Sequence, residues 1–200
     1  MSAENRLDGA RIFAAKIAQL RGKIPRGLPL AHKGLDALEC FDFSRVPRSY
    51  CCGDLTLENI IVAGDGRLYL IDFLDSFYDS WQLDAAKLLQ DLELKWSWRR
   101  GQVSGNLAMR LEAGRSLLLG GLAARPDGAE TIRTVYYLLL LTCLRIYPYA
   151  RDDATMAWLD GAVGKAMAAI DGVAVSRLDY TNKTKDLEVG DGYFADTVRG

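Results

Sequence analysis

The chain has 200 residues, half of them apolar and 26% charged, which is typical of one compact globular domain. Its 25 basic and 26 acidic residues nearly cancel. This balance disfavours binding to an acidic membrane surface or to nucleic acid, and with it the interpretation as a helical nucleic-acid-binding module. The longest apolar run, residues 135–144, is too short to cross a bilayer, for which about 20 residues are needed.

The cysteines indicate a reducing compartment. Cys51 and Cys52 are adjacent, and neither they nor Cys40 and Cys143 show the paired spacing of metal ligands. The first residues also lack the charged-then-apolar pattern of a secretory signal. This usage favours reduced thiols, and we therefore expect a cytoplasmic protein.

Helices are predicted before a short β-hairpin. Residues 3–24 carry apolar side chains at steps of three and four, which predicts an amphipathic helix, and a second short helix is expected over 31–41. Two β-branched runs, 59–63 and 68–72, flank an Asp-Gly turn at 65–66. Such a pair between two strand-like runs is among the strongest local signals for a hairpin.

The sequence is predicted to be helical again after residue 80. Asp127 and Asp152 stand where they could cap two of the later helices. Residues 173–200 are polar and contain glycines, which predicts an irregular C-terminal tail. The predicted fold class is α+β, mostly α, with residues 1–172 forming one lobe. The expected helices cover residues 80–95, 105–123, 128–147 and 152–171.

The hairpin is expected to bring polar side chains together. With Asp65 and Gly66 as a two-residue turn, Asn59 directly faces Asp72, and opposed Cα atoms lie about 5 Å apart. An amide oxygen and a carboxylate at the open end of a hairpin are hard oxygen ligands of the kind that Mg²⁺ prefers. Asp54 lies in the loop entering the same end, where its carboxylate can reach a hydroxyl presented beside the metal.

These residues match a known motif. The segment 52–59, Cys-Gly-Asp-Leu-Thr-Leu-Glu-Asn, followed by Leu-Ile-Asp-Phe at 70–73, resembles the aminoglycoside phosphotransferase and choline kinase superfamily. That superfamily has a His-Gly-Asp motif, an Asn five residues after the Asp, and Ile-Asp-Phe or Ile-Asp-Trp after a short hairpin. Asp-Ala-Ala-Lys-Leu-Leu at 84–89 is similar to the family's next helix, whose Asp braces the catalytic loop. The resemblance covers residues 49–95 and is only architectural for the flanking helices.

The resemblance implies a protein-kinase-like C-terminal lobe with a central β-hairpin surrounded by helices. In that scheme Asp54 is the catalytic base, and Asn59 and Asp72 hold the Mg²⁺ bound to the co-substrate ATP. Cys52 stands where the family usually has His and, with Asp84, gives structural support to the loop. The implied reaction moves the ATP γ-phosphoryl group to a hydroxyl of a small molecule, such as an aminoglycoside, choline, ethanolamine or a sugar. The cysteine predicts weakened activity rather than its loss.

The N-terminal lobe of such kinases is not predicted. Segment 1–53 reads as helices, with no Gly-rich loop after a strand, and Lys16 falls on an amphipathic helix. We therefore expect either that the chain is a fragment or that the missing lobe comes from a complementary chain or a homo-oligomer, and that the chain alone is weakly active or inactive. The alternative is a non-catalytic kinase-like remnant that serves as a binding module or as half of a split enzyme.

Simpler interpretations stand beside these. Asp54, Asn59 and Asp72 would also suit ordinary loop and turn positions. Asp75 is predicted to be a solvated acid rather than a second metal ligand, and His32 an exposed helix residue. Three tryptophans, Trp81, Trp96 and Trp98, have a functional interpretation, as a substrate wall or as cover for the surface that a missing lobe would bury. The favoured interpretation is that at least two of them pack in the core.

Overall fold

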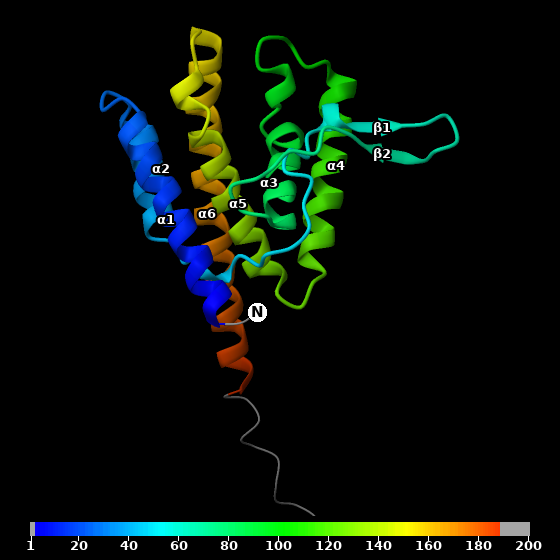
Figure 1. Ribbon diagram of the computed structural model, residues 1–200. Helices are drawn as coiled ribbons and strands as arrows, with labels where there is room; N and C mark the ends of the chain where they lie inside the picture. Colours follow the sequence, from blue (N-terminus) through cyan, green and yellow to red (C-terminus); the bar gives the residue numbers. More distant parts are fainter. Residues whose placement is uncertain (1–2, 189–200) are drawn as a thin grey trace, which may run out of the picture.

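The computed structural model describes the backbone of residues 3–188 and the side chains of residues 7–173. This part of the chain is mostly helical with one small antiparallel sheet (Figure 1). The mostly α, α+β class predicted from the sequence is therefore confirmed. The helices are α1 (Ala3–Lys23), α2 (Pro29–Glu39), α3 (Trp81–Leu92), α4 (Gly105–Ala123), α5 (Gly128–Leu144) and α6 (Asp153–Glu188), and the strands are β1 (Ile60–Val62) and β2 (Leu68–Leu70).

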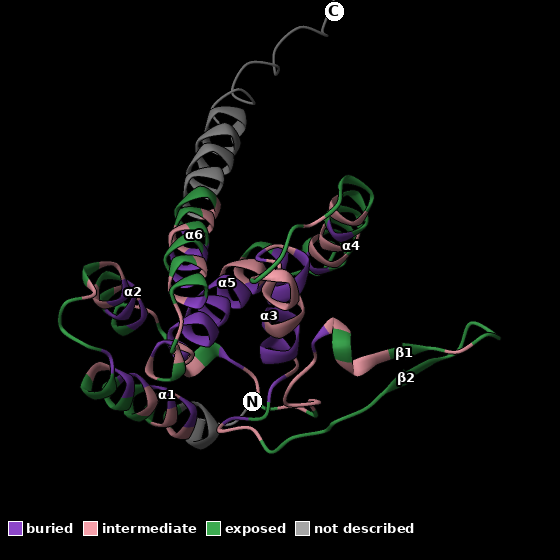
Figure 2. Cartoon of the chain, turned by 90° about the horizontal axis from the view of Figure 1, so that it is seen from above, coloured by how far each residue is buried: buried purple, intermediate pink, exposed green. Residues whose placement is uncertain are grey.

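The centre of the core is α5. Every residue of α5 from Thr134 to Leu144 is buried (Figure 2). A helix that is apolar on all sides is stable in water only when other elements surround it. Here α3 and α4 lie on one side, and α1, α2 and α6 lie on the other (Figures 1 and 2). The helical body is thus built around α5.

An aromatic cluster fixes the chain on both sides of the hairpin. Phe13 of α1 stacks on Phe43 with ring centroids 4.4 Å apart and contacts Tyr78 at 4.9 Å. The Tyr78 hydroxyl donates to the carbonyl oxygen of Val46 over 2.8 Å. Because Val46 precedes the hairpin and Tyr78 follows it, this cluster anchors both of its connections to α1.

The hairpin register differs from the predicted one by one residue. Ile60 pairs with Leu70, and the N–H of Ile71 donates to the carbonyl oxygen of Asn59 over 3.1 Å. Asn59 therefore stands opposite Ile71 rather than Asp72, and the expectation that Asn59 directly faces Asp72 is wrong.

The turn explains this difference. The Ala63 N–H donates to the Arg67 carbonyl over 2.8 Å, and the Gly66 N–H donates to the Ala63 carbonyl over 2.9 Å. Gly66 has a φ of 82°, in the left-handed region. A type I turn closed by a left-handed glycine makes a three-residue loop, 64–66, instead of the two-residue turn assumed from the Asp-Gly pair.

The hairpin projects from the helical body and is not surrounded by helices (Figures 1 and 2). The paired side chains of Val62 and Leu68 are 66% and 67% exposed. The predicted central, enclosed position is therefore wrong. Apolar side chains on a projecting ribbon form the kind of exposed surface that usually has a partner.

The predicted helices agree with the structure in place and type, with differences at the ends. The carboxylate of Asp152 accepts the N–H of Thr155 over 2.9 Å at the start of α6, as predicted for a cap. Asp127 makes no side-chain cap bond to α5, so that prediction is wrong. Residues 173–188 continue α6 instead of forming an irregular tail, and residues 189–200 lie outside the described part.

Candidate active site

The loop that carries Asp54 is held by an acid of α3. The Asp84 carboxylate accepts the backbone N–H of Cys52 over 2.6 Å and that of Gly53 over 3.1 Å. Burial raises the pKa of Asp84, and these two N–H bonds act in the opposite direction. Charged acceptors make strong hydrogen bonds, so Asp84 fixes the direction in which the chain enters Asp54.

A second acid of α3 holds the far end of the same loop. Asp91 is fully buried and accepts the Leu57 N–H over 2.9 Å. Its other oxygen accepts the N–H and the hydroxyl of Ser97, over 3.1 and 2.8 Å. Sequence reasoning did not identify Asp91. The available signal was its position two helical turns after Asp84, on the same face of α3.

Gly53 is required by a close contact. Its φ is 83°, and a Cβ at this position would lie 2.0 Å from the Leu74 carbonyl oxygen. The Leu74 N–H donates to the Cys52 carbonyl over 3.0 Å. The segment that follows β2 thus packs directly on the loop before Asp54, which leaves no room for a side chain at residue 53.

Cys52 contributes its backbone and a neutral thiol. Burial raises the pKa of the Cys52 thiol, and the nearby negative charge of Asp84 raises it further. The residue therefore packs beside the bracing acid as an uncharged side chain. It is placed where structural support for the loop is possible.

Asp54 forms an ion pair with Lys87 of α3. The Lys87 Nζ lies 2.6 Å from Asp54 Oδ1, and the two side chains are 23% and 27% exposed. The Oδ1 atom is shielded from solvent, yet no donor in the described residues meets the angles of a hydrogen bond to it. The contact is therefore mainly electrostatic. Lys87 belongs to the segment resembling the family's next helix, but its pairing with Asp54 was not predicted.

The side chain of Asn59 bonds back to the loop of which Asn59 is the last residue. Its side-chain amide nitrogen donates to the backbone carbonyl of Asp54 over 2.8 Å. This bond fixes the orientation of the Asn59 amide with its nitrogen toward the loop, because the Asp54 carbonyl oxygen can only accept a hydrogen bond. The amide oxygen makes no hydrogen bond in the described part of the chain and is free to serve as a ligand. The structure thus brings Asn59 and Asp54 together.

Asp72 comes directly after Ile71, whose N–H donates to the Asn59 carbonyl. Its backbone has a φ of 57°, an unusual left-handed value for a residue other than glycine. The side chain is exposed and makes no hydrogen bond or ion pair among the side chains of residues 7–173. Main-chain pairing therefore connects Asp72 to Asn59, although the two residues are not directly opposed.

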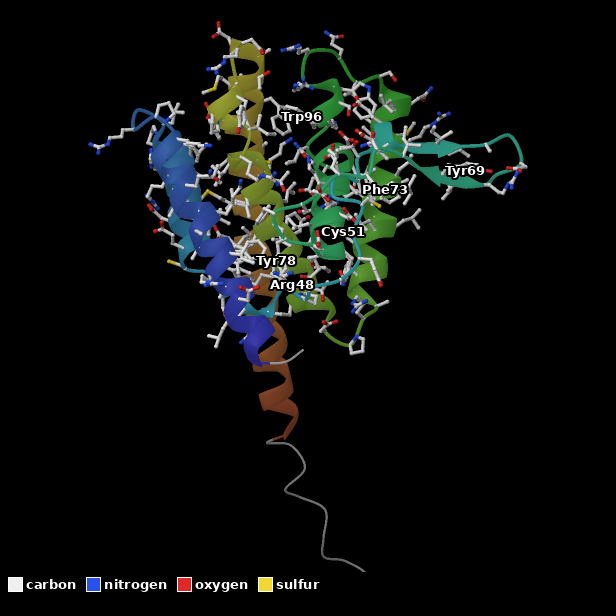
Figure 3. The ribbon with its side chains drawn as sticks, viewed as in Figure 1. Arg48, Cys51, Tyr69, Phe73, Tyr78 and Trp96 are labelled. Atoms are coloured by element: carbon white, nitrogen blue, oxygen red, sulfur yellow. The ribbon has the colours of Figure 1, made fainter. Side chains whose placement is uncertain are left out.

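A surface cavity of ≈ 600 Å³ lies beside this site. It is formed by the two connections of the hairpin, one near Cys51 and the other near Phe73 (Figure 3). Asp75 and Asp79 both line it. Tyr69, by contrast, lies out on the projecting ribbon (Figure 3). The cavity therefore lies at the base of the hairpin next to the candidate site, although none of the three predicted site residues lines it.

Among the described residues, no helix has both the length and the apolar character that a membrane span requires. In that same part of the chain, no three His, Cys, Asp or Glu side chains are grouped to hold a metal ion. The two ligands predicted for Mg²⁺ are one amide and one carboxylate, a smaller set. Comparison of the chain with protein-family models, with curated proteins and with solved structures gives no match.

Proposed function

We propose that this chain is the catalytic lobe of a kinase-type phosphotransferase that moves the γ-phosphoryl group of ATP to a hydroxyl of a small molecule. One observation carries the proposal. The loop from Cys52 to Asn59 closes on itself through the Asn59–Asp54 hydrogen bond, and Asp84 braces its start. This arrangement supports a base and a metal ligand held in one rigid frame, which phosphoryl transfer needs because it relies on positioning and charge neutralisation.

In this proposal the chain's own residues have separate roles. Asp54 orients the acceptor hydroxyl and takes its proton as the bond to phosphorus forms. Asn59, through its free amide oxygen, and Asp72, through its exposed carboxylate, would hold Mg²⁺, which neutralises phosphate charge when bound. Lys87 keeps the Asp54 carboxylate in place by its positive charge.

We further propose that a complementary lobe, on another chain or on a second copy, covers the hairpin. Support comes from the exposed apolar side chains at its strands and base, of which Phe73 is 63% exposed. Ligand pockets are concave and lined mainly by apolar side chains, and a projecting hairpin does not enclose such a pocket by itself. The free thiols are consistent with the cytoplasmic location that we also propose.

A second candidate is a kinase-like binding module without catalysis. The observation that favours it is the Lys87–Asp54 ion pair, since a base already engaged by an ammonium group is less available to an acceptor hydroxyl. In this alternative the loop, its brace and the hairpin serve only as a scaffold for a partner.

Calorimetric titration with ATP distinguishes the two. We expect weak binding that requires Mg²⁺, is lost in Asp72→Ala and is kept in Asp75→Ala, a matched exposed acid nearby. Asp54→Asn is expected to retain nucleotide binding and to abolish turnover. Equal heats for the wild type and Asp72→Ala would remove the magnesium site. Turnover that survives in Asp54→Asn would exclude Asp54 as the base.

A further inference from the structure

A second cavity, of ≈ 470 Å³, is strongly basic. It lies between α1, the segment after α3, the end of α5 and the start of α6. Among the described residues that line it, seven are lysine or arginine and one, Asp152, is acidic. The whole chain has a net charge of −1, so this concentration of positive charge is local.

Most of these cations have no acidic partner. Lys87 pairs with Asp54, and Arg100 pairs with Asp152 over 2.7 Å. Within residues 7–173, no carboxylate lies within ion-pair distance of the remaining five. These are Lys16, Lys23, Arg99, Arg145 and Arg151.

Two of the unpaired arginines are held against aromatic rings. The Arg99 guanidinium stacks on Trp96 at 3.7 Å from the ring centroid, and Figure 3 shows Trp96 between the helices of the body. The Nε of Arg99 is shielded from solvent and has no hydrogen-bond partner in the described part. Arg145 lies over Phe77 at 5.1 Å. Such stacking orients a guanidinium without neutralising it.

The concentration of positive charge is unfavourable without a ligand. Burial lowers the pKa of Arg145, an effect that the charge of Asp54 opposes. Burial also lowers the pKa of Lys16, and the charges of Arg145 and Lys23 lower it further. Like charges held together in a partly desolvated cavity are stabilised when an anion enters.

The cavity adjoins the candidate base but not the candidate nucleotide ligands. Lys87 lines it and contacts Asp54, so one side chain separates the cavity from that carboxylate. Asn59, Asp72 and the hairpin strands do not line it. An acceptor in the cavity would approach Asp54 past Lys87, through a space that is lined by neither Asn59 nor Asp72 nor the hairpin strands.

We propose that this cavity is the acceptor site and that the acceptor is an anionic small molecule, a hydroxyl compound bearing a phosphate or carboxylate group. The inference rests on the proposed function and narrows it. Cationic acceptors such as aminoglycosides, choline and ethanolamine would be repelled, and a phosphorylated or acidic sugar-like molecule fits. Arginine is well suited to the task because its planar donors match phosphate and carboxylate oxygens.

The test is calorimetric titration of the full chain, without nucleotide, with glycerol phosphate, glycerol and choline. We expect binding of glycerol phosphate alone, weakened as salt rises from about 50 to 200 mM. Arg145→Met should weaken it about tenfold, the effect of losing one charged hydrogen bond. The melting temperature should not fall, because the variant removes like-charge repulsion. Arg110→Met, which removes an exposed cation of α4, is the matched control and should bind as the wild type does.

The outcomes separate the two proposals. Binding of glycerol phosphate that Arg145→Met and Arg151→Gln leave unchanged, or choline binding of similar strength, would overturn the acceptor site. Competition between glycerol phosphate and a non-hydrolysable ATP analogue with Mg²⁺ would overturn it too, since the cavity would then be part of the nucleotide site. Glycerol phosphate binding that persists in Asp72→Ala supports the cavity, whether or not that variant still binds the nucleotide.

Discussion

Lys87 Nζ lies 2.6 Å from Asp54 Oδ1, and Asp84, one turn earlier on the same helix, holds the two residues before Asp54 by their N–H groups. The two α3 residues thus act on adjoining points of one loop, the first by charge and the second by hydrogen bonds. The ion pair is only partly shielded from solvent, since the Lys87 and Asp54 side chains remain 23% and 27% exposed. The geometry of Asp54 therefore depends on α3.

The first prediction concerns this ion pair. In a double-mutant cycle of Asp54→Asn and Lys87→Met, we expect a coupling free energy of about 1 kcal/mol, the upper end of the range measured for exposed pairs, because this pair is partly shielded from solvent. Urea unfolding of the four proteins measures it. The coupling should persist in high salt better than that of an exposed pair, because partly buried charges are less screened.

Asp65 and Arg67 provide a matched control. Their ion pair has the same 2.6 Å separation but lies at the exposed hairpin tip. The corresponding cycle, Asp65→Asn with Arg67→Met, should give a smaller coupling that salt removes. A larger coupling at the tip than at Asp54 would mean that Lys87 does not fix the loop.

The second prediction compares two glycines with nearly identical backbones. Gly53 and Gly66 have φ values of 83° and 82°. A Cβ on Gly53 would collide with the Leu74 carbonyl, whereas one on Gly66 would meet nothing within 4 Å. We expect Gly66→Ala to cost about 1 kcal/mol, from backbone strain alone, and Gly53→Ala more than about 3 kcal/mol. Chemical denaturation measures both, and equal losses would contradict the close contact.

Several features followed from the sequence because they depend on local pattern. Apolar periodicity placed the helices, and β-branched runs placed the strands of the hairpin. The register did not follow, since an Asp-Gly pair suits both a two-residue turn and the three-residue loop that Gly66 closes. The ion pair between Asp54 and Lys87 joins residues far apart in sequence, and only the packing of α3 on the loop decides it. The role of Asp91 likewise depends on how α3 packs on the loop, which local sequence pattern does not show.

The third prediction concerns neighbouring buried residues of α3 with opposite effects. Asp91 satisfies three donors, so Asp91→Asn, which puts an amide among them, is expected to cost about 3 kcal/mol. Gln90 is equally buried, yet neither its amide nitrogen nor its oxygen has a partner in the described structure. Gln90→Met is expected to stabilise the protein by about 1 kcal/mol. Thermal or urea unfolding of each variant measures the sign of the change in stability. Destabilisation by Gln90→Met would show that the Gln90 amide is hydrogen-bonded in the wild type.

The fourth prediction is a pH dependence at the start of α6. The ion pair with Arg100 and the bonds from Thr155 lower the pKa of Asp152 from 3.8 to about 2. A carboxyl whose pKa is lower in the folded state stabilises that state above its unfolded value, and the contribution disappears as the pH falls through the folded value. Asp152→Ala should therefore lower the melting temperature at about pH 6.

The difference in melting temperature between Asp152→Ala and the wild type should shrink between pH 3.8 and about 2, where the wild-type carboxyl takes up its proton. Asp127→Ala is the control, because Asp127 precedes α5 without making a cap bond, and its effect at about pH 6 should be smaller. A constant difference across the range would assign the effect of Asp152 to packing rather than charge. A difference that follows the expected titration would show that Asp152, the one acid among the described residues lining the basic cavity, is ionised at neutral pH and available to pair with Arg100. Within residues 7–173, the other five unpaired cations of the cavity would then still lack an acidic partner.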